Sequence, residues 1–292
     1  MGLVNSMGSK FVICADIDPP KGVDTAGLFR TANLLKGRID ALIVNDMPSA
    51  VMRMGSLATS YLLKERGLET ICNITCRDRN VLALQSDILS AASLGLENIY
   101  ISRGDDITYG DHPRAKPVNE LDDDQLLTVL GRLKEGTDAG GNKLTSAPRL
   151  NIGVTLQCGP AHNSPDQEIE IINDKIARGA AFFIVSPVFD LNAFEKFTAR
   201  ISKKVRAPII AEMILLKSVA TARYINKHIQ GITVPDKYID RLYSAPDKQK
   251  ESIAIAVELI TGLKKLCNGV SIKAMGWEEK IPSYLDAVES SA

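Results

Sequence analysis

The sequence predicts a single (β/α)8 barrel domain over residues 1–292. Short apolar runs alternate along the whole chain with stretches of helical apolar spacing. The runs are apolar on both faces, as strands of a parallel sheet covered by helices must be. Neither end of the series carries a polar edge strand, which favours a closed barrel over an open sheet. Such a barrel takes about 250 residues, and the chain has 292.

Eight segments are predicted to be strands, because each is a short apolar run that ends at polar or turn-forming residues. In order they are 10–16, 41–44, 68–75, 98–102, 150–156, 181–186, 207–213 and 269–272. Two prolines, Pro19 and Pro20, prevent the first strand from continuing. In a barrel, the carboxyl ends of all eight strands face one mouth, where a site is built.

Eight segments with helical spacing are predicted to be helices. In order they are 25–35, 49–65, 80–94, 123–134, 165–178, 192–205, 218–227 and 248–267. Asp24 and Asn80 are the expected N-caps of the first and third, because short polar side chains accept hydrogen bonds from free N–H groups. The long connection 106–122 is of a length that is usually functional or disordered.

The composition argues against several classes of protein. The formal net charge is zero, which gives no general field for nucleic acid or an anionic membrane. No apolar run reaches the roughly 18 residues of a membrane span, and residues 1–10 lack a signal-peptide core. The five cysteines contain no C-x-x-C pair, and the three histidines lie far apart. We therefore expect no metal site, and buried free thiols in a cytoplasmic protein.

Polar and charged residues follow the predicted strand ends. Any one of them could cap a helix or pair with a neighbour, but together they favour a site for acid–base chemistry on a small molecule. They are Asp16, Asp18, Asn45, Asp46, Asn73, Thr75, Arg103, Asp105, Gln157, Ser186 and Glu212. No G-x-G-x-x-G or Walker loop follows any strand, which counts against a Rossmann dinucleotide site.

A series of motifs runs in order along nearly the whole chain. It comprises DIDPPKG (16–22), TCRDRN (75–80), ALQSDIL (83–89), RGD (103–105), GDHP (110–113), AKPV (115–118), GA (179–180), PVFD (187–190), VPD (234–236) and GWE (276–278). The series resembles the methylenetetrahydrofolate reductases, flavin-dependent barrel enzymes of one-carbon metabolism. It is most similar to their short bacterial branch of acetogens and relatives, which lacks a C-terminal regulatory domain.

The resemblance implies reduction of 5,10-methylenetetrahydrofolate to 5-methyltetrahydrofolate by hydride from a reduced flavin. FAD is the implied cofactor, with FMN as the alternative, and NADH is the implied electron donor. Two catalytic residues are implied. Asp105 falls on the aspartate that lies near the flavin ring and tunes it. Asp16 falls on the general acid, which is a glutamate in the family and is one methylene shorter here.

The resemblance also implies a set of binding residues. Those for the cofactor are Asn45, Asn73, Thr75, Arg103, Gly104, Asp105, Gln157, Glu168 and Lys175. Lys175 matches a lysine that reaches the phosphate side of the cofactor. Those for the substrate are Ser186, which stands where the family has a pterin-contacting glutamine, and Glu212, which stands where a Gly-Ile-x-Pro segment usually begins.

Three functions therefore stay open. The chain is an authentic reductase with a modified acid, or a family member acting on a different C1 or pterin substrate, as Ser186 and Glu212 favour. Alternatively it is a flavin-bearing subunit that works only beside an electron-transfer partner, such as the iron–sulfur partner common in the acetogen branch. The long helix at 248–267 either supports a homo-oligomer interface or simply covers the barrel.

Overall fold

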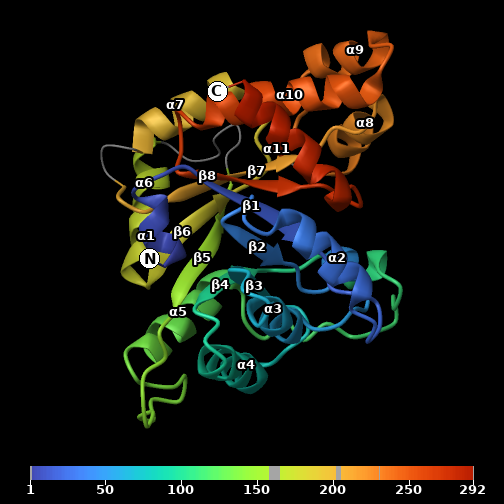
Figure 1. Cartoon of the computed structure of the whole chain (residues 1–292). Helices are drawn as coiled ribbons and strands as arrows, with labels where there is room; N and C mark the ends of the chain where they lie inside the picture. The colour runs from blue at the N-terminus through green and yellow to red at the C-terminus, as the bar shows by residue number, and fades with distance from the viewer. Residues whose placement is uncertain (1, 158–164, 202–204, 230, 292) are drawn as a thin grey trace.

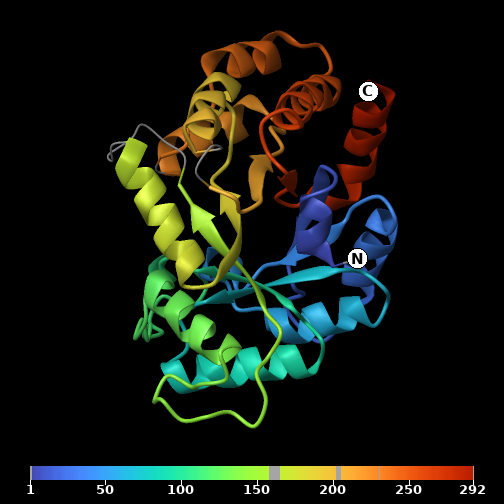
Figure 2. The same cartoon turned by 90° about the vertical axis from the view of Figure 1, so that its left-hand side faces the viewer.

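The computed structural model describes residues 2–157, 165–201, 205–229 and 231–291. Eight parallel strands form a closed barrel in the order of the sequence, and helices surround it (Figures 1 and 2). The strands are β1 (Val12–Ile17), β2 (Ala41–Val44), β3 (Thr70–Thr75), β4 (Asn98–Ser102), β5 (Asn151–Leu156), β6 (Ala180–Val185), β7 (Ile209–Ile214) and β8 (Gly269–Lys273). Since β8 pairs with both β7 and β1, the sheet has no edge and the predicted barrel is confirmed.

The helices that follow the strands come in the predicted order. They are α2 (Ala26–Leu35), α3 (Ser56–Lys64), α4 (Val81–Ser93), α5 (Asp123–Lys134), α6 (Pro165–Ala177), α7 (Leu191–Ile201), α8 (Val219–His228) and α10 (Lys248–Leu263). Asn80 caps α4 as predicted, because its side chain accepts the Ala83 N–H at 2.9 Å. The N-cap of α2 is Thr25 and not Asp24 as predicted, although Asp24, one residue earlier, accepts the Ala26 N–H. No described helix is long and apolar enough to cross a membrane.

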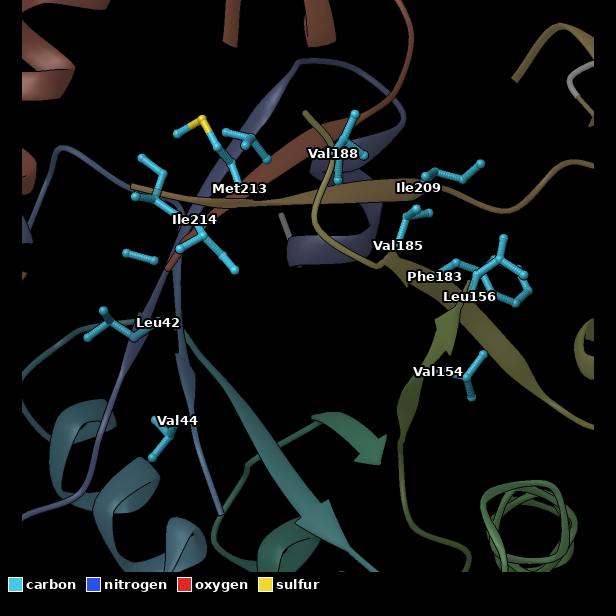
Figure 3. Packing of buried hydrophobic residues seen from close by; sticks show 14 of the residues in the cluster. Leu42, Val44, Val154, Leu156, Phe183, Val185, Val188, Ile209, Met213 and Ile214 are labelled. Carbon is cyan, nitrogen blue, oxygen red and sulfur yellow. The ribbon is translucent and has the colours of Figure 1, made fainter. Parts of the chain in front are cut away.

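Alternation along the strands separates two apolar layers. Residues facing the barrel interior form one cluster, which includes Val12, Cys14, Ala41, Ile43, Ile71, Phe182, Ile184 and Ile210. The alternate residues pack against the helices, and Figure 3 shows some of them, among them Leu42, Val44, Val154, Leu156, Phe183 and Val185. Consequently a polar residue on the interior face near a strand's carboxyl end points into the mouth of the barrel.

The helix predicted from residue 49 begins only at Ser56. Before it lies the 3₁₀ turn η1 (Pro48–Ala50), where Ser49 has a φ of 55°. Backbone N–H groups here bond to distant side chains: Ser49 to Asp105 at 2.6 Å and Met52 to Asp111 at 2.9 Å. Tertiary hydrogen bonds thus replace the helical ones, and the prediction for residues 49–55 was wrong.

Three helices were not predicted: α1 (Leu3–Met7), α9 (Asp236–Ser244) and α11 (Ile281–Ser290). Two residues of α1, Leu3 and Met7, join the interior cluster and close the amino-terminal end of the barrel. The long helix α10 ends at Leu263 rather than 267, because the chain turns there towards Asn268, whose side chain accepts the Ile209 N–H. The predicted end of α7 at residue 205 falls beyond Ile201, next to residues outside the described ranges.

The cysteines match the expectation of free thiols as far as they are described. Cys14, Cys72 and Cys76 are buried and unpaired, and Cys267 is free and half-buried. Burial raises the pKa of all four thiols, so they stay neutral near pH 7. Cys158 lies outside the described residues.

Candidate active site

Three strands bring opposite charges together inside the mouth of the barrel. Lys273, at the end of β8, has its Nζ 3.3 Å from Glu212 Oε1 on β7 and 3.8 Å from Asp16 Oδ2 on β1. Ser271 donates a hydrogen bond of 2.7 Å to the other oxygen of Asp16. We call Asp16, Glu212 and Lys273 the acid–lysine cluster. It holds two carboxylates and one ammonium group.

Asp16 holds its proton to a higher pH than an ordinary carboxyl group does. Its residue surface is 6% exposed, and burial raises its pKa from the ordinary 3.8 to about 6. Lys273 and the Ser271 hydroxyl oppose this rise, while Glu212 adds to it. The carboxylates of Glu212 and Asp16 in turn raise the pKa of Lys273, which therefore stays charged. The cluster contains a permanent cation beside a carboxyl group that can act as a general acid.

A neutral tyrosine faces the same space from β4. Burial raises the pKa of Tyr100, and its hydroxyl forms a hydrogen bond of 2.7 Å with Thr155 on β5. The backbone oxygen of Tyr100 accepts a hydrogen bond from Asn73 Nδ2 at 3.0 Å, which also donates to Ser102 Oγ at 3.0 Å. Asn73 is therefore held by β4 rather than free to rotate.

A second buried carboxylate fixes the end of β3. The Asp46 side chain is fully buried and accepts hydrogen bonds from the N–H and the hydroxyl of Thr75, both at 3.0 Å. Arg79 forms an ion pair with Asp46 at 2.7 Å and a second one with Asp87 at 2.9 Å. These bonds satisfy the buried charge and hold Thr75 in one orientation.

A recess of about 240 Å³ lies beyond the end of β4. Its lining consists of Arg77, Arg103, Gly104, Asp105, Asp106, Ile107, Pro117 and Asn119. Gly104 has a φ of +85°, and a Cβ there would lie 3.2 Å from the Thr75 Cβ, so only glycine fits without strain. Arg103 is exposed and forms no ion pair with any described residue, whereas Arg77 is paired with Asp78 at 2.6 Å.

Asp105 lies on the rim of this recess. Its carboxylate accepts the Ser49 N–H at 2.6 Å, and its carbonyl oxygen accepts a hydrogen bond from Arg77 at 2.9 Å. The recess therefore combines one guanidinium available to a ligand with a close backbone approach at Gly104. The carboxylates of Asp105 and Asp106 lie on the same lining, so the recess carries both signs of charge.

The predicted site residues thus fall into separate groups. The structure brings Asp16 and Glu212 together, joins Asn73 to Thr75 through Asp46, and lines one recess with Arg103, Gly104 and Asp105. Asn45, Gln157 and Ser186 belong to none of these groups. Asn45 donates a hydrogen bond to Asp18 at 2.9 Å, Gln157 is exposed, and the Ser186 N–H donates to the Leu156 carbonyl oxygen.

The structure does not bring Glu168 and Lys175 into contact with these groups. Both lie on α6 and bind neighbouring helices: Glu168 pairs with Arg200 at 3.0 Å, and Lys175 pairs with Asp124. Their role in cofactor binding stays a prediction.

Sequence reasoning missed Lys273, because the strand was predicted to end at Ile272. A signal was present. Gly269 and Ser271 alternate with apolar residues, and continuing that alternation by one step places Lys273 on the interior face. The partnership of Arg79 with Asp46 was also missed. It joins residues 33 positions apart, and no local pattern marks it.

Comparison with solved structures supports the barrel fold. Tryptophan synthase of M. tuberculosis, in an open form with BRD0059 bound, superposes with a TM-score of 0.51 at 11% identity, covering 99% of this chain and 93% of that chain. Yersinia pestis DHPS with a pterine-sulfa conjugate superposes with a TM-score of 0.50 at 12% identity, covering 97% and 94%. At such low identity these likenesses concern the fold alone.

Comparison by sequence identifies the family. No curated protein sequence matches this chain. The family model for methylenetetrahydrofolate reductase, in contrast, matches residues 5–283, which is nearly the whole chain. The match spans all eight strands and every group of the candidate site described above. The chain belongs to the methylenetetrahydrofolate reductase family.

Proposed function

We propose that this protein reduces 5,10-methylenetetrahydrofolate to 5-methyltetrahydrofolate with a bound flavin. Family membership supports the reaction class, an oxidoreductase acting on a folate. The observation that carries the proposal is the buried Asp16, a carboxyl group with a raised pKa in the mouth of the barrel. Such a group is what the reaction requires as a proton donor.

Arg103 and Gly104, in the recess beside β4, support contact with a flavin nucleotide. Arg103 offers a planar guanidinium that matches phosphate oxygens, and Gly104 allows the backbone to approach closely. We propose FAD as the cofactor, with FMN as the alternative, and NADH as the electron donor. When bound, the reduced flavin supplies the hydride for the methylene carbon.

Asp16 delivers the proton. The C–N10 bond of the folate opens when N10 accepts a proton, and Asp16 gives up that proton directly or through one water molecule. The carboxylate left behind is stabilised by Lys273 Nζ, 3.8 Å away, and by the Ser271 hydroxyl at 2.7 Å. Asp105, held by the Ser49 N–H, acts on the flavin through its negative charge.

Ser186 and Glu212 bear on the second candidate function, reduction of a different pterin or C1 carrier. A pterin edge prefers a bidentate partner, and the Ser186 hydroxyl is too short to replace an amide. Glu212 can accept two N–H groups, but it is already paired with Lys273. If the substrate is an ordinary folate, Glu212 must share its oxygens between Lys273 and the pterin.

Kinetics of the Asp16→Asn and Asp16→Glu variants test the proposal. With methylenetetrahydrofolate, Asp16→Asn is expected to lower kcat by roughly 10²–10⁴-fold, whereas Asp16→Glu keeps the acid. Asp174→Asn, which removes an exposed partner of Arg178 on α6, serves as the matched control. Turnover of the Asp16→Asn variant at the wild-type rate overturns the role of Asp16. Flavin-loaded wild-type protein without folate activity points to another substrate, or to a partner that supplies electrons.

A further inference from the structure

We propose that Glu212 and Lys273 are positioning residues that keep one proton on Asp16. The inference deepens the proposed function, since it concerns the control of the same acid. It rests on the contacts of the acid–lysine cluster, and the ionisation of Asp16 can be measured without any substrate.

Lys273 is shared unequally between the two carboxylates. Its Nζ is hydrogen-bonded to Glu212 at 3.3 Å, while Asp16 lies at 3.8 Å, beyond hydrogen-bond distance. Glu212 is therefore the direct partner of the ammonium group. Asp16 receives its one short hydrogen bond from the neutral Ser271 hydroxyl at 2.7 Å.

The net charge of the cluster then decides where a proton resides. With both carboxylates ionised the cluster carries one negative charge, and with one proton bound it is neutral. Burial favours the state in which the cluster has no net charge, because an uncompensated charge in a low-dielectric interior is costly. The proton goes to the carboxylate with the weaker cationic partner, which is Asp16. Glu212 thus holds Lys273 away from the acid, and Asp16 keeps its proton up to a higher pH.

Within the described part of the chain, the other groups that face Asp16 do not compensate its charge. Cys14 on β1 and Tyr100 on β4 have pKa values raised by burial and stay neutral. Asp18 adds a weak negative influence, but it is exposed and bonded to Asn45. On β2, the residue paired with Asp16 is the uncharged Ile43. Control of the proton therefore lies with Glu212 and Lys273.

This arrangement predicts opposite effects for two substitutions. Glu212→Gln removes the competing carboxylate. Lys273 can then turn to Asp16, and the apparent pKa of Asp16 falls. Lys273→Met removes the cation, so the two carboxylates share a proton and their higher apparent pKa rises. Each midpoint is expected to move by about one pH unit or more, in opposite directions. A role limited to holding the strands together would not reverse sign between the two variants.

The experiment is a carboxyl ¹³C NMR titration of the full-length protein, purified without added folate. The Asp16 signal is assigned by its loss in Asp16→Asn. The controls come from a second Glu–Lys pair on the outer helices, Lys237 and Glu258, which lie 3.2 Å apart. Glu258→Gln and Lys237→Met should leave the Asp16 midpoint unchanged.

The titration midpoint of the Asp16 carboxyl signal is expected near pH 6 in the wild type. It is expected to be lower in Glu212→Gln and higher in Lys273→Met. If Lys273→Met fails to fold, the fall of the midpoint in Glu212→Gln decides the inference, and Lys273→Arg, which keeps the charge, is a control that should keep the wild-type midpoint. Midpoints that do not move, or that move the same way in both variants, overturn the inference.

The proposed function can fail separately. If the midpoints move as stated but wild-type protein reduces no folate, the function is wrong and the inference stands. If the wild type reduces folate but the Asp16 titration midpoint stays unchanged in Glu212→Gln and Lys273→Met, the inference is wrong and the function stands.

Discussion

Burial of Asp16 makes the folded protein less stable as pH rises, and Asp16→Asn removes this effect. The pKa of Asp16 is about 6 in the folded state and 3.8 ordinarily. Between these values the folded state binds the proton more strongly than the unfolded state, so the free energy of unfolding falls with increasing pH. At about 1.36 kcal/mol per pH unit the total loss is about 3 kcal/mol, and it levels off about one pH unit above the folded-state pKa of about 6.

Urea unfolding of wild type and Asp16→Asn at two pH values measures this loss. Of the total, about 2 kcal/mol develops between roughly pH 4.5 and pH 7.5. The stability of the Asp16→Asn variant relative to wild type should therefore increase by that amount over this range. Taking the difference between the two proteins cancels the titration of all other groups that the substitution leaves unchanged. The Asp174→Asn variant should show no such trend.

A relative stability that stays constant with pH would refute the reasoning, because it would mean that Asp16 has the same pKa in the folded and unfolded states. A relative stability that falls with pH would show a lowered pKa. In that case Lys273 would dominate over burial, and Asp16 would be ionised and unable to act as the acid.

Three further predictions concern the rest of the site. Asp46→Ala leaves Arg79 and Thr75 without their buried partner and should lower the free energy of unfolding by about 3–5 kcal/mol in urea titrations; a loss below about 1 kcal/mol would contradict the network. Gly104→Ala, at a φ of +85°, should cost about 1–2 kcal/mol of stability and lower the flavin content of the purified protein; unchanged content would exclude close approach at this position. Arg103→Gln should weaken flavin binding about tenfold in fluorescence titrations while leaving stability within about 0.5 kcal/mol; equal affinity would remove Arg103 from the cofactor site.

The barrel could be predicted because its signal is local. Each strand is a short apolar run, and every one of the eight was found within a few residues of its observed bounds. The helix start at 49 failed for a physical reason. The backbone of Ser49 and Met52 bonds to Asp105 and Asp111, which lie more than fifty residues away. The local sequence pattern does not predict hydrogen bonds to such distant residues.

The candidate site was predictable in its residue types but not in its partnerships. Asp16 and Glu212 were identified at strand ends, yet their interaction with Lys273 depends on β8 closing the barrel between β1 and β7. Glu168 and Lys175, which only the resemblance implies, form ion pairs with Arg200 on α7 and Asp124 on α5, and their role in cofactor binding stays a prediction. Which side chains meet across the barrel depends on the strand register and on closure of the sheet. Composition and periodicity do not give either one.

The visible spectrum of the purified protein shows whether a bound flavin passes electrons to the folate. It is recorded anaerobically, first as isolated, then after NADH, then after methylenetetrahydrofolate. We expect a flavin spectrum that bleaches with NADH and returns when the folate is added, with 5-methyltetrahydrofolate formed in equal amount. A bleached flavin that the folate does not reoxidise, or a protein that binds no flavin, would contradict this expectation.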